Sequence, residues 1–361
     1  MSYLDRIAAL KSRLEAMGSQ ARLDLPFVPG RAPTQAFSEF LTNKEQGDWA
    51  EQTFIHNFNA SGSDLWATKY GRSEDRIAGE PGFTEFYAEY QNELREIGKR
   101  PDVLLFERHI LDHKGLLITD ISALPRDQLD EMVPLAKAAV EVRSSAFLSR
   151  CYETAANAEA ATLQDQARGA AIRLLNEFTD ELHQFAPAWL AFAQALVNQS
   201  AAGVAPRALG RRATDRLKQA SDLTKLIKDC LKELEKRRFL SITPKAEDLS
   251  LVYRWLQRYG VPHHYCQVFF DRAILISFEH ILELLATPAR ENVDFFIESD
   301  EKNQGKVTFK IDVRLGQEVM SGIGLPLHRS AMKELPWGRL LFYVRFERST
   351  AVMSNKVVFD A

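Results

Sequence analysis

The sequence predicts a mixed α/β protein, in which helices flank a mixed β-sheet and a large helical segment interrupts the chain. Short apolar runs rich in β-favouring residues, such as VLLF and AAVEV, occur before residue 150, and similar runs return after residue 244. Between them, residues 147–240 are Ala-rich with helical spacing and no strand signal. A chain of 361 residues is long for one core, so one elaborated domain or two intimate ones are expected.

Residues 1–35 predict one amphipathic helix followed by a Pro- and Gly-containing link. The apolar residues of this helix follow helical spacing: Leu4, Ile7, Leu10, Leu14 and Met17. Charged residues run throughout the segment, so it is no signal peptide. The longest apolar stretch, residues 186–197, is too short to span a bilayer. Three widely separated cysteines suit a reducing compartment, and a cytoplasmic protein without a membrane partner is expected.

Residues 36–150 mix helix and strand and are expected to form the first part of the core. The expected elements are a helix at 43–58, a strand at 64–71, a helix at 83–98, a hairpin at 101–120 turning near 113–115, and a buried strand at 138–145.

Residues 151–245 predict a helical insertion, and residues 246–361 predict the second part of the core with a β-rich end. The expected elements are a helix at 247–260 stopped by Gly260, a strand at 263–271, a helix at 277–286, and strands at 295–300, 306–315, 339–347 and 355–360. The helical segment therefore separates two halves of one α/β core.

Two acids stand where buried strands begin or continue. Asp102 precedes the apolar run VLLF, and Glu141 lies inside AAVEV. An ionised carboxylate among apolar neighbours is costly unless a metal or a cation holds it. Two such acids on adjacent strands form a site for Mg²⁺, which takes oxygen ligands and usually enters with phosphate, so phosphodiester cleavage is predicted. In a purely structural interpretation, Asp102 opens a strand and Glu141 pairs with Arg143 or Arg150.

These acids are part of a wider resemblance. The helix segment Gly47-Asp48-Trp49-Ala50-Glu51, the pair Pro101-Asp102 and the strand motif Glu141-x-Arg143 together resemble the core of the PD-(D/E)XK nucleases. With the phrases VEVRSSAFL and YRWLQRYGVPHHYCQVFFDRAILISFEHIL, the chain most resembles type II restriction endonucleases of the AccI kind, over roughly residues 40–290.

The resemblance implies a magnesium-dependent mechanism. Asp102, Glu141 and the carbonyl of Val142 would hold Mg²⁺, with Glu51 as a further acid or outer ligand. Hydrolysis would leave 5′-phosphate ends. Arg143 stands where the family has a lysine; arginine stays protonated, so it is a poor general base but can stabilise negative charge on a phosphate. Another lysine, such as Lys137, could reach the site instead.

A basic surface for DNA is expected in the helical insertion and near the C-terminus. From Arg207 to Arg238 there are eleven Lys and Arg against five Asp and Glu, some at helical spacing. The predicted DNA-binding residues are Arg211, Arg212, Lys218, Lys225, Arg339 and Arg345. An ordinary solvated helix face is the competing interpretation of the lysines.

Taken with the resemblance, the residues predict a Mg²⁺-dependent, sequence-specific endonuclease acting on double-stranded DNA in a restriction–modification system. A cognate DNA methyltransferase would be its functional partner. Cutting both strands of a palindromic site favours a homodimer, formed through the N-terminal helix or the helical insertion unless these pack within the protomer. Two alternatives remain: a structure-specific or repair nuclease, and a non-enzymatic DNA-binding protein in which Arg143 marks a decayed site.

Overall fold

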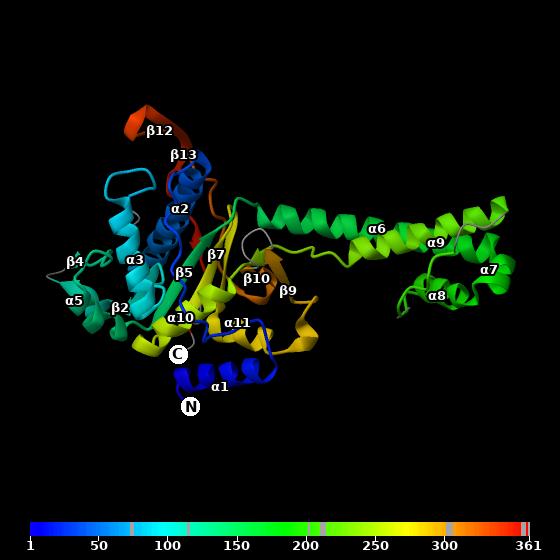
Figure 1. The fold of residues 1–361 in the computed structure, drawn as a ribbon, viewed down its shortest axis with the longest axis horizontal. Helices are drawn as coiled ribbons and strands as arrows, with labels where there is room; N and C mark the ends of the chain where they lie inside the picture. Colours follow the sequence, from blue (N-terminus) through cyan, green and yellow to red (C-terminus); the bar gives the residue numbers. More distant parts are fainter. Residues whose placement is uncertain are drawn as a thin grey trace. The chain divides into compact units, whose positions relative to one another are not determined.

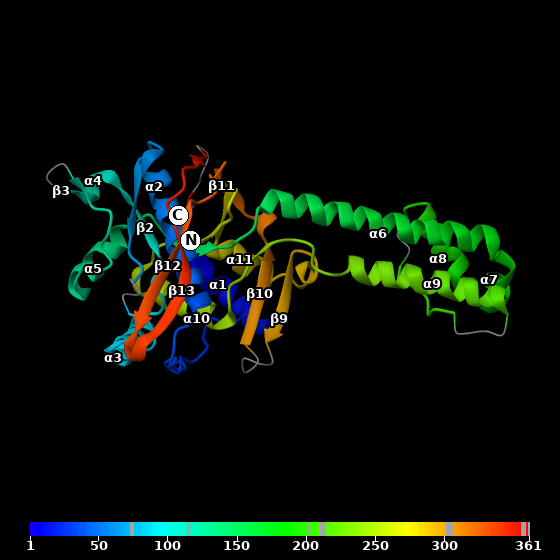
Figure 2. The same cartoon turned by 90° about the horizontal axis from the view of Figure 1, so that it is seen from above.

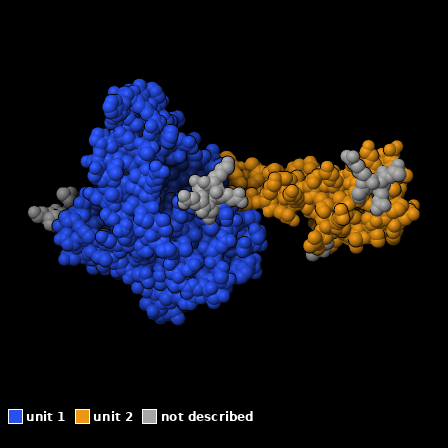
Figure 3. Space-filling view, in the orientation of Figure 1, with its two compact units in different colours: residues 1–149, 240–361 blue, residues 150–239 orange. Residues whose placement is uncertain are grey.

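The computed structural model describes residues 1–72, 76–113, 116–200, 203–209, 214–300, 306–354 and 359. The chain divides into two compact units, shown in different colours in Figure 3. One unit consists of residues 1–149 and 240–361, and the other of residues 150–239. The sequence-based boundaries at 35, 150 and 245 stay predictions.

Seven strands form the central sheet of the first unit. They are β1 (Leu65–Lys69), β2 (Val103–Glu107), β5 (Ala138–Ser144), β7 (His263–Val268), β8 (Arg272–Ser277), β11 (Gln317–Ser321) and β14 (Val352–Met353), in that spatial order. Neighbouring strands are antiparallel except β5 and β7, which are parallel. The expectation of a mixed sheet in an α/β protein is therefore confirmed.

Helices cover both faces of this sheet (Figures 1 and 2). The helices of this unit are α1 (Tyr3–Ala16), α2 (Ser38–Ala60), α3 (Phe83–Ile97), α4 (Arg108–Leu111), α5 (Arg126–Met132), α10 (Ala246–Tyr259) and α11 (Phe278–Leu285). Single 3₁₀ turns occur at Val133–Leu135, Pro288–Arg290, Val313–Leu315 and Pro336–Gly338.

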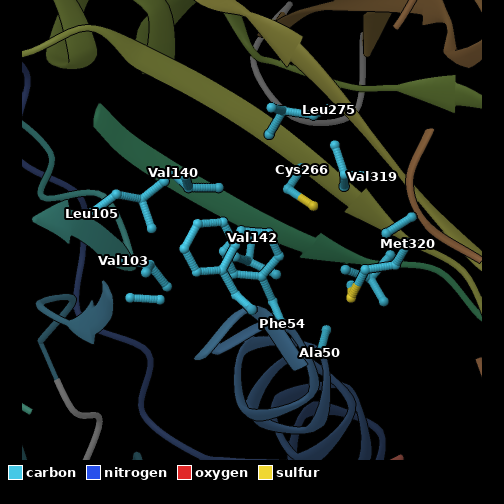
Figure 4. Close-up of a cluster of buried hydrophobic side chains, with 14 of the residues drawn as sticks. Ala50, Phe54, Val103, Leu105, Val140, Val142, Cys266, Leu275, Val319 and Met320 are labelled. Atoms are coloured by element: carbon cyan, nitrogen blue, oxygen red, sulfur yellow. The ribbon is translucent and has the colours of Figure 1, made fainter. Parts of the chain in front are cut away.

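Helix α2 packs on one face of the sheet. Its residues Ala50 and Phe54 belong to one buried cluster with apolar side chains of β2, β5, β7, β8 and β11 (Figure 4). Val140 and Val142 of β5 belong to this buried cluster. Because successive side chains of a strand point to opposite faces, Glu141 and Arg143 point to the other face.

The other face carries aromatic residues. His263 and Tyr265 of β7 have ring centroids 5.2 Å apart, and His263 also contacts Trp255 of α10 and Phe278 of α11. Helix α1 packs against α11, with Arg6 paired to Glu279 at 2.7 Å. The apolar side of the N-terminal helix is therefore buried within its own chain.

The region expected to be one hairpin, residues 101–120, is built differently. Strand β2 pairs with β1 and β5, and α4 separates it from a small hairpin of β3 (Asp112–His113) and β4 (Leu116–Leu117). Arg108, the first residue of α4, donates hydrogen bonds from its side chain to the carbonyls of Ser63, at 2.7 Å, and Asn59, at 3.3 Å. The predicted turn residues Lys114 and Gly115 lie outside the described residues.

The second half of the chain contains the strands expected at 295–300, 306–315 and 339–347, and others that were not expected. Strands β8 and β11 complete the sheet, and β12 (His328–Leu335) pairs with β13 (Arg339–Phe346) as a separate hairpin that packs on α2. A second small sheet contains β6 (Ser241–Ile242), β10 (Lys306–Asp312) and β9 (Phe295–Asp300). The strand expected at 355–360 falls almost wholly outside the described residues.

The described residues of the second unit form helices and connecting segments, without a strand. Its helices are α6 (Ser149–Glu177, whose first residue belongs to the other unit), α7 (Thr179–Phe185), α8 (Pro187–Val197) and α9 (Asp215–Leu234). Helices α6 and α9 lie side by side in both views (Figures 1 and 2). Leu174, Phe178 and Ile227 belong to a buried cluster that joins these helices to α8.

Candidate active site

Asp102 lies directly before β2 and opposite Glu141. The register pairs Val103 with Val140, so the next residues outward, Asp102 and Glu141, face each other across β2 and β5. The Asp102 carboxylate accepts a hydrogen bond from the backbone N–H of Val142 at 2.7 Å. Burial, followed by the charges of Glu141 and Glu51, raises the pKa of Asp102 well above its ordinary value. The site therefore favours a cation next to Asp102.

The backbone of Asp102 is held by the end of β1. Its carbonyl accepts hydrogen bonds from the N–H groups of Tyr70, at 2.8 Å, and Gly71, at 2.9 Å. A Cβ atom added at Gly71 would come within 2.9 Å of the Asp102 Cα and 3.1 Å of its Oδ1. Glycine at position 71 thus allows the close approach that positions this carboxylate.

Gly71→Ala is expected to lower the free energy of unfolding by about 1–3 kcal/mol, because the added methyl overlaps backbone that cannot move freely. Cleavage activity should fall with it, since Asp102 would shift. Chemical denaturation and a plasmid-cleavage assay measure the two effects. Gly169→Ala is the control: that glycine lies in α6 with open space around it, and alanine there should be neutral or slightly stabilising. Equal stability of the two variants would contradict the prediction.

Glu141 is almost completely buried, with 2% of its surface exposed. Its Oε1 atom is bonded by the amine of Lys99 and by the guanidinium of Arg143, the latter at 2.9 Å. Burial alone would raise the pKa of Glu141, but the charges of Lys99 and Arg143 outweigh it and the pKa is lowered. The Oε2 atom is buried without a hydrogen-bond partner among the described residues. The carboxylate of Glu141 is thus ionised, and one of its two oxygens has no hydrogen-bond partner among the described residues.

Arg143 joins the acids of β5 and α10. Besides Glu141, it contacts Asp248 Oδ2 at 3.3 Å. The charge of Glu141 is the main cause of a raised pKa for Arg143, so its guanidinium stays positive. Arg143 occupies the position at which the family that this sequence resembles has a lysine.

Lys99 is the site residue that the sequence analysis did not single out. It follows Gly98, which ends α3 with a positive φ of +81°, a backbone conformation that residues with a side chain rarely adopt. Arg254 of α10 donates to the carbonyls of Leu94, at 3.4 Å, and Arg95, at 2.8 Å, and this docks the end of α3 on α10. The only sequence signal is the position of Lys99, three residues before Asp102.

The charges of Glu141, Asp248 and Asp102 keep Lys99 protonated. Burial and Arg143 would lower the pKa of Lys99, yet the acids outweigh them and raise it. Lys137, the alternative lysine, instead pairs with Glu107 at 3.0 Å, and 53% of its side chain is exposed. A lysine therefore does reach the acids, and it is Lys99.

Glu51 lies in α2 and contacts Lys69 of β1 at 3.6 Å. Burial raises the pKa of Glu51 to about 7, and Glu141 contributes to the increase through its charge. The structure thus places Glu51 within electrostatic range of Asp102 and Glu141, while its ion pair is with Lys69.

Glu51→Gln is expected to raise the free energy of unfolding at pH 8 by up to about 3 kcal/mol, because about 2.5 pH units separate the ordinary and folded-state pKa values. Since the folded-state pKa is raised, the contribution of the wild-type carboxyl to stability is present below pH 4.5 and is lost as the pH rises to about 7. Urea denaturation of both proteins at pH 5 and pH 8 checks this. A stabilisation that is equal at both pH values would show that ionisation of Glu51 is not the cause.

A cavity of about 370 Å³ opens next to these acids. Lys99, Asp102, Glu141, Val142 and Arg143 all contribute to its wall. The proposed metal ligands and the two cations therefore share one open space. Among the described residues, no three Asp, Glu, His or Cys side chains are grouped so that they could hold a metal ion by themselves.

The residues predicted to bind DNA lie in several places. Lys218 and Lys225 are exposed on α9. Arg339 bonds Gln35 at 2.7 Å and Arg345 pairs with Glu45 at 3.2 Å, so both are engaged with α2 and the segment before it. Arg211 and Arg212 lie outside the described residues. Contact between these residues and DNA stays a prediction.

The site at β2 and β5, with two acids and two cations, has the composition of a hydrolytic site for a phosphorylated substrate. The family model of the AccI restriction endonuclease matches residues 1–359, and the chain belongs to this family. It is thus a type II site-specific deoxyribonuclease whose substrate is DNA, which supports the enzyme over the non-enzymatic alternative.

Searches of curated proteins and of solved structures found no match. Within the described residues, no helix is long and apolar enough to cross a membrane.

Proposed function

We propose that this enzyme cuts both strands of duplex DNA at a specific sequence by Mg²⁺-dependent hydrolysis on a PD-(D/E)XK-type core, leaving 5′-phosphate ends. The observation that carries the proposal is the state of Glu141. Two cations bind one of its oxygens, while the other is buried without a partner among the described residues and lies on the strand opposite Asp102.

The residues fit a magnesium ion. Mg²⁺ is usually bound through one or two carboxylates and keeps several waters, so it does not require three protein acids. Asp102 and Glu141 would hold it, with the carbonyl of Val142 as a further oxygen ligand. Because the pKa of Asp102 is raised by burial and by neighbouring acids, binding of the ion would displace a proton from its carboxyl.

A bound Mg²⁺ supplies a Lewis acid that polarises the phosphate and lowers the pKa of a water. Lys99 and Arg143 hold Glu141 ionised, and each keeps a positive charge beside the cavity. The Val142 N–H fixes the orientation of Asp102. Lys99 therefore acts as a cation that stabilises negative charge on the phosphate. The strand lysine of the family would have the same role. Arg143 adds a second positive charge.

The enzyme would work in a restriction–modification system. Membership of a restriction endonuclease family supports a cytoplasmic enzyme working beside a DNA methyltransferase that protects the same sequence. A homodimer would place one site on each strand of a palindromic sequence. Light scattering of the protein with and without DNA measures its oligomeric state.

Digestion of a long sequenced DNA, followed by mapping of both ends of every fragment, tests the proposal. Cuts at one recurring sequence in Mg²⁺, 5′-phosphates at the ends, and no cutting in EDTA are the expected results. Intact DNA of varied sequence in both Mg²⁺ and Mn²⁺ would overturn the metal-dependent mechanism.

A further inference from the structure

Helix α3 carries an aromatic stripe that is not buried in the core. Phe83, Phe86, Tyr87 and Tyr90 follow the spacing of one helix face, and all four are only partly buried. The fully buried residues of α3 are Leu94 and Ile97, near its end. Phe83 packs in part against a small buried cluster that includes Leu41 and Leu335. The surface that the four rings leave partly exposed is available for a further contact.

The four rings face the cavity of about 370 Å³ at the active site. Together with Phe40 of α2, they form its aromatic wall, and the acids and cations described above form another part of the same wall. We call this space the aromatic cavity. Its volume is near the lower end for pockets that take small organic groups, about 300–1,000 Å³. It suits a single nucleotide-sized group.

Polar groups at the rim are largely neutralised by one another. The guanidinium of Arg72 lies 4.8 Å from the centre of the Phe86 ring and pairs with Glu89 at 3.0 Å. Arg100 pairs with Glu93 at 2.7 Å. A flat, weakly polar group that stacks on rings and hydrogen-bonds at its edge matches this lining better than a second phosphate does.

We propose that the aromatic cavity receives one nucleobase that leaves the helical stack of the DNA next to the scissile phosphate. The proposal rests on the proposed function, because the acids in the shared wall must hold that phosphate. A base inside an intact duplex has both faces covered by its neighbours, so only an extruded base can stack on these rings. Extrusion would also bring the phosphate backbone towards Asp102 and Glu141.

The test uses duplexes that contain the cleavage sequence found by end mapping, bound to the full chain in Ca²⁺ under conditions that leave them intact. Permanganate reports unpaired thymines, bisulfite reports unpaired cytosines, and 2-aminopurine fluorescence reports extruded purines. We expect one position beside the scissile phosphate to become unpaired when the wild-type protein binds. A bound duplex that is paired at every position would overturn the proposal.

Two variants then locate the receiving site. Phe86→Leu keeps an apolar side chain but removes the stacking ring, and it should weaken binding by about tenfold and reduce the unpaired signal. Phe86→Tyr keeps the ring and should retain both. Phe185→Leu is the matched control, since Phe185 lies in α7 of the helical unit and 38% of it is exposed. If Phe86→Leu fails to fold, DNA binding and the unpaired signal are measured with Phe83→Leu instead.

Extrusion that persists unchanged in both Phe86→Leu and Phe83→Leu would show that another part of the protein receives the base, and would overturn the assignment to this cavity. Failure of the wild-type protein to cut any DNA would instead overturn the proposed function. Cutting without an unpaired position would leave that function standing and remove only the base-receiving role.

Discussion

Glu141→Gln is expected to reduce the rate of DNA cleavage by about 10³-fold or more while DNA binding persists. Glutamine cannot bring the negative charge that would hold Mg²⁺ beside Asp102, and a bound metal ion contributes several kcal/mol to the stabilisation of a phosphoryl transition state. Glutamine is preferable to alanine here. Removing one partner of a buried ion pair costs about 3–5 kcal/mol, whereas the glutamine oxygen can still accept hydrogen bonds from Lys99 and Arg143.

Single-turnover cleavage and a gel-shift assay measure the two quantities for Glu141→Gln. Asp102→Asn should behave in the same way, because Asp102 faces Glu141 across the two strands. Glu15→Gln, at an exposed position of α1, is the control and should cut at the wild-type rate. Full activity of either site variant would show that these acids do not hold the metal.

Lys99→Ala is expected to lower the cleavage rate by about 10²–10³-fold, the usual loss when one charge-stabilising donor is removed from an active site. Lys99 is protonated beside Glu141, so its loss removes a positive charge from the wall of the cavity. Arg143 still neutralises Glu141 in the variant, and the fold should persist. Lys99→Arg should recover part of the activity because it restores the charge.

Lys137→Ala is the matched control for Lys99, because Lys137 is exposed and pairs with Glu107 away from these acids. It should cut DNA at the wild-type rate. Measuring the cleavage rate separately from DNA affinity distinguishes a lost transition-state cation from weakened binding. If Lys137→Ala were inactive and Lys99→Ala active, the assignment of the lysine would be wrong.

Much of the fold was predictable because local patterns agree with the tertiary structure. Helices α1, α2, α3, α10 and α11 and the buried strands β2, β5 and β7 fall close to the segments expected from apolar spacing. The error at residues 101–120 concerned pairing partners. A run of β-favouring residues predicts extended backbone, but whether β2 pairs with the following segment or with β1 and β5 depends on contacts distant in sequence.

The candidate site was partly visible for a similar reason. Asp102 and Glu141 were conspicuous because acids rarely stand among apolar strand residues, and alternation along β5 places Glu141 and Arg143 on one face. The aromatic cavity was not visible. The spacing of Phe83, Phe86, Tyr87 and Tyr90 predicts an amphipathic helix, and only the packing of the chain shows that these rings line a cavity.

Sequence alone established the positions of the two acids, the α/β class and the long helical segment, since these follow from local composition and periodicity. Tertiary structure decided which cation neutralises Glu141. Lys99 stands in a polar stretch where nothing in the local pattern marks it, and the docking of α3 on α10 brings it to β5. Such a contact depends on the packing of the whole unit, because the lysine and its carboxylate partner are distant in sequence and are brought together only by the fold.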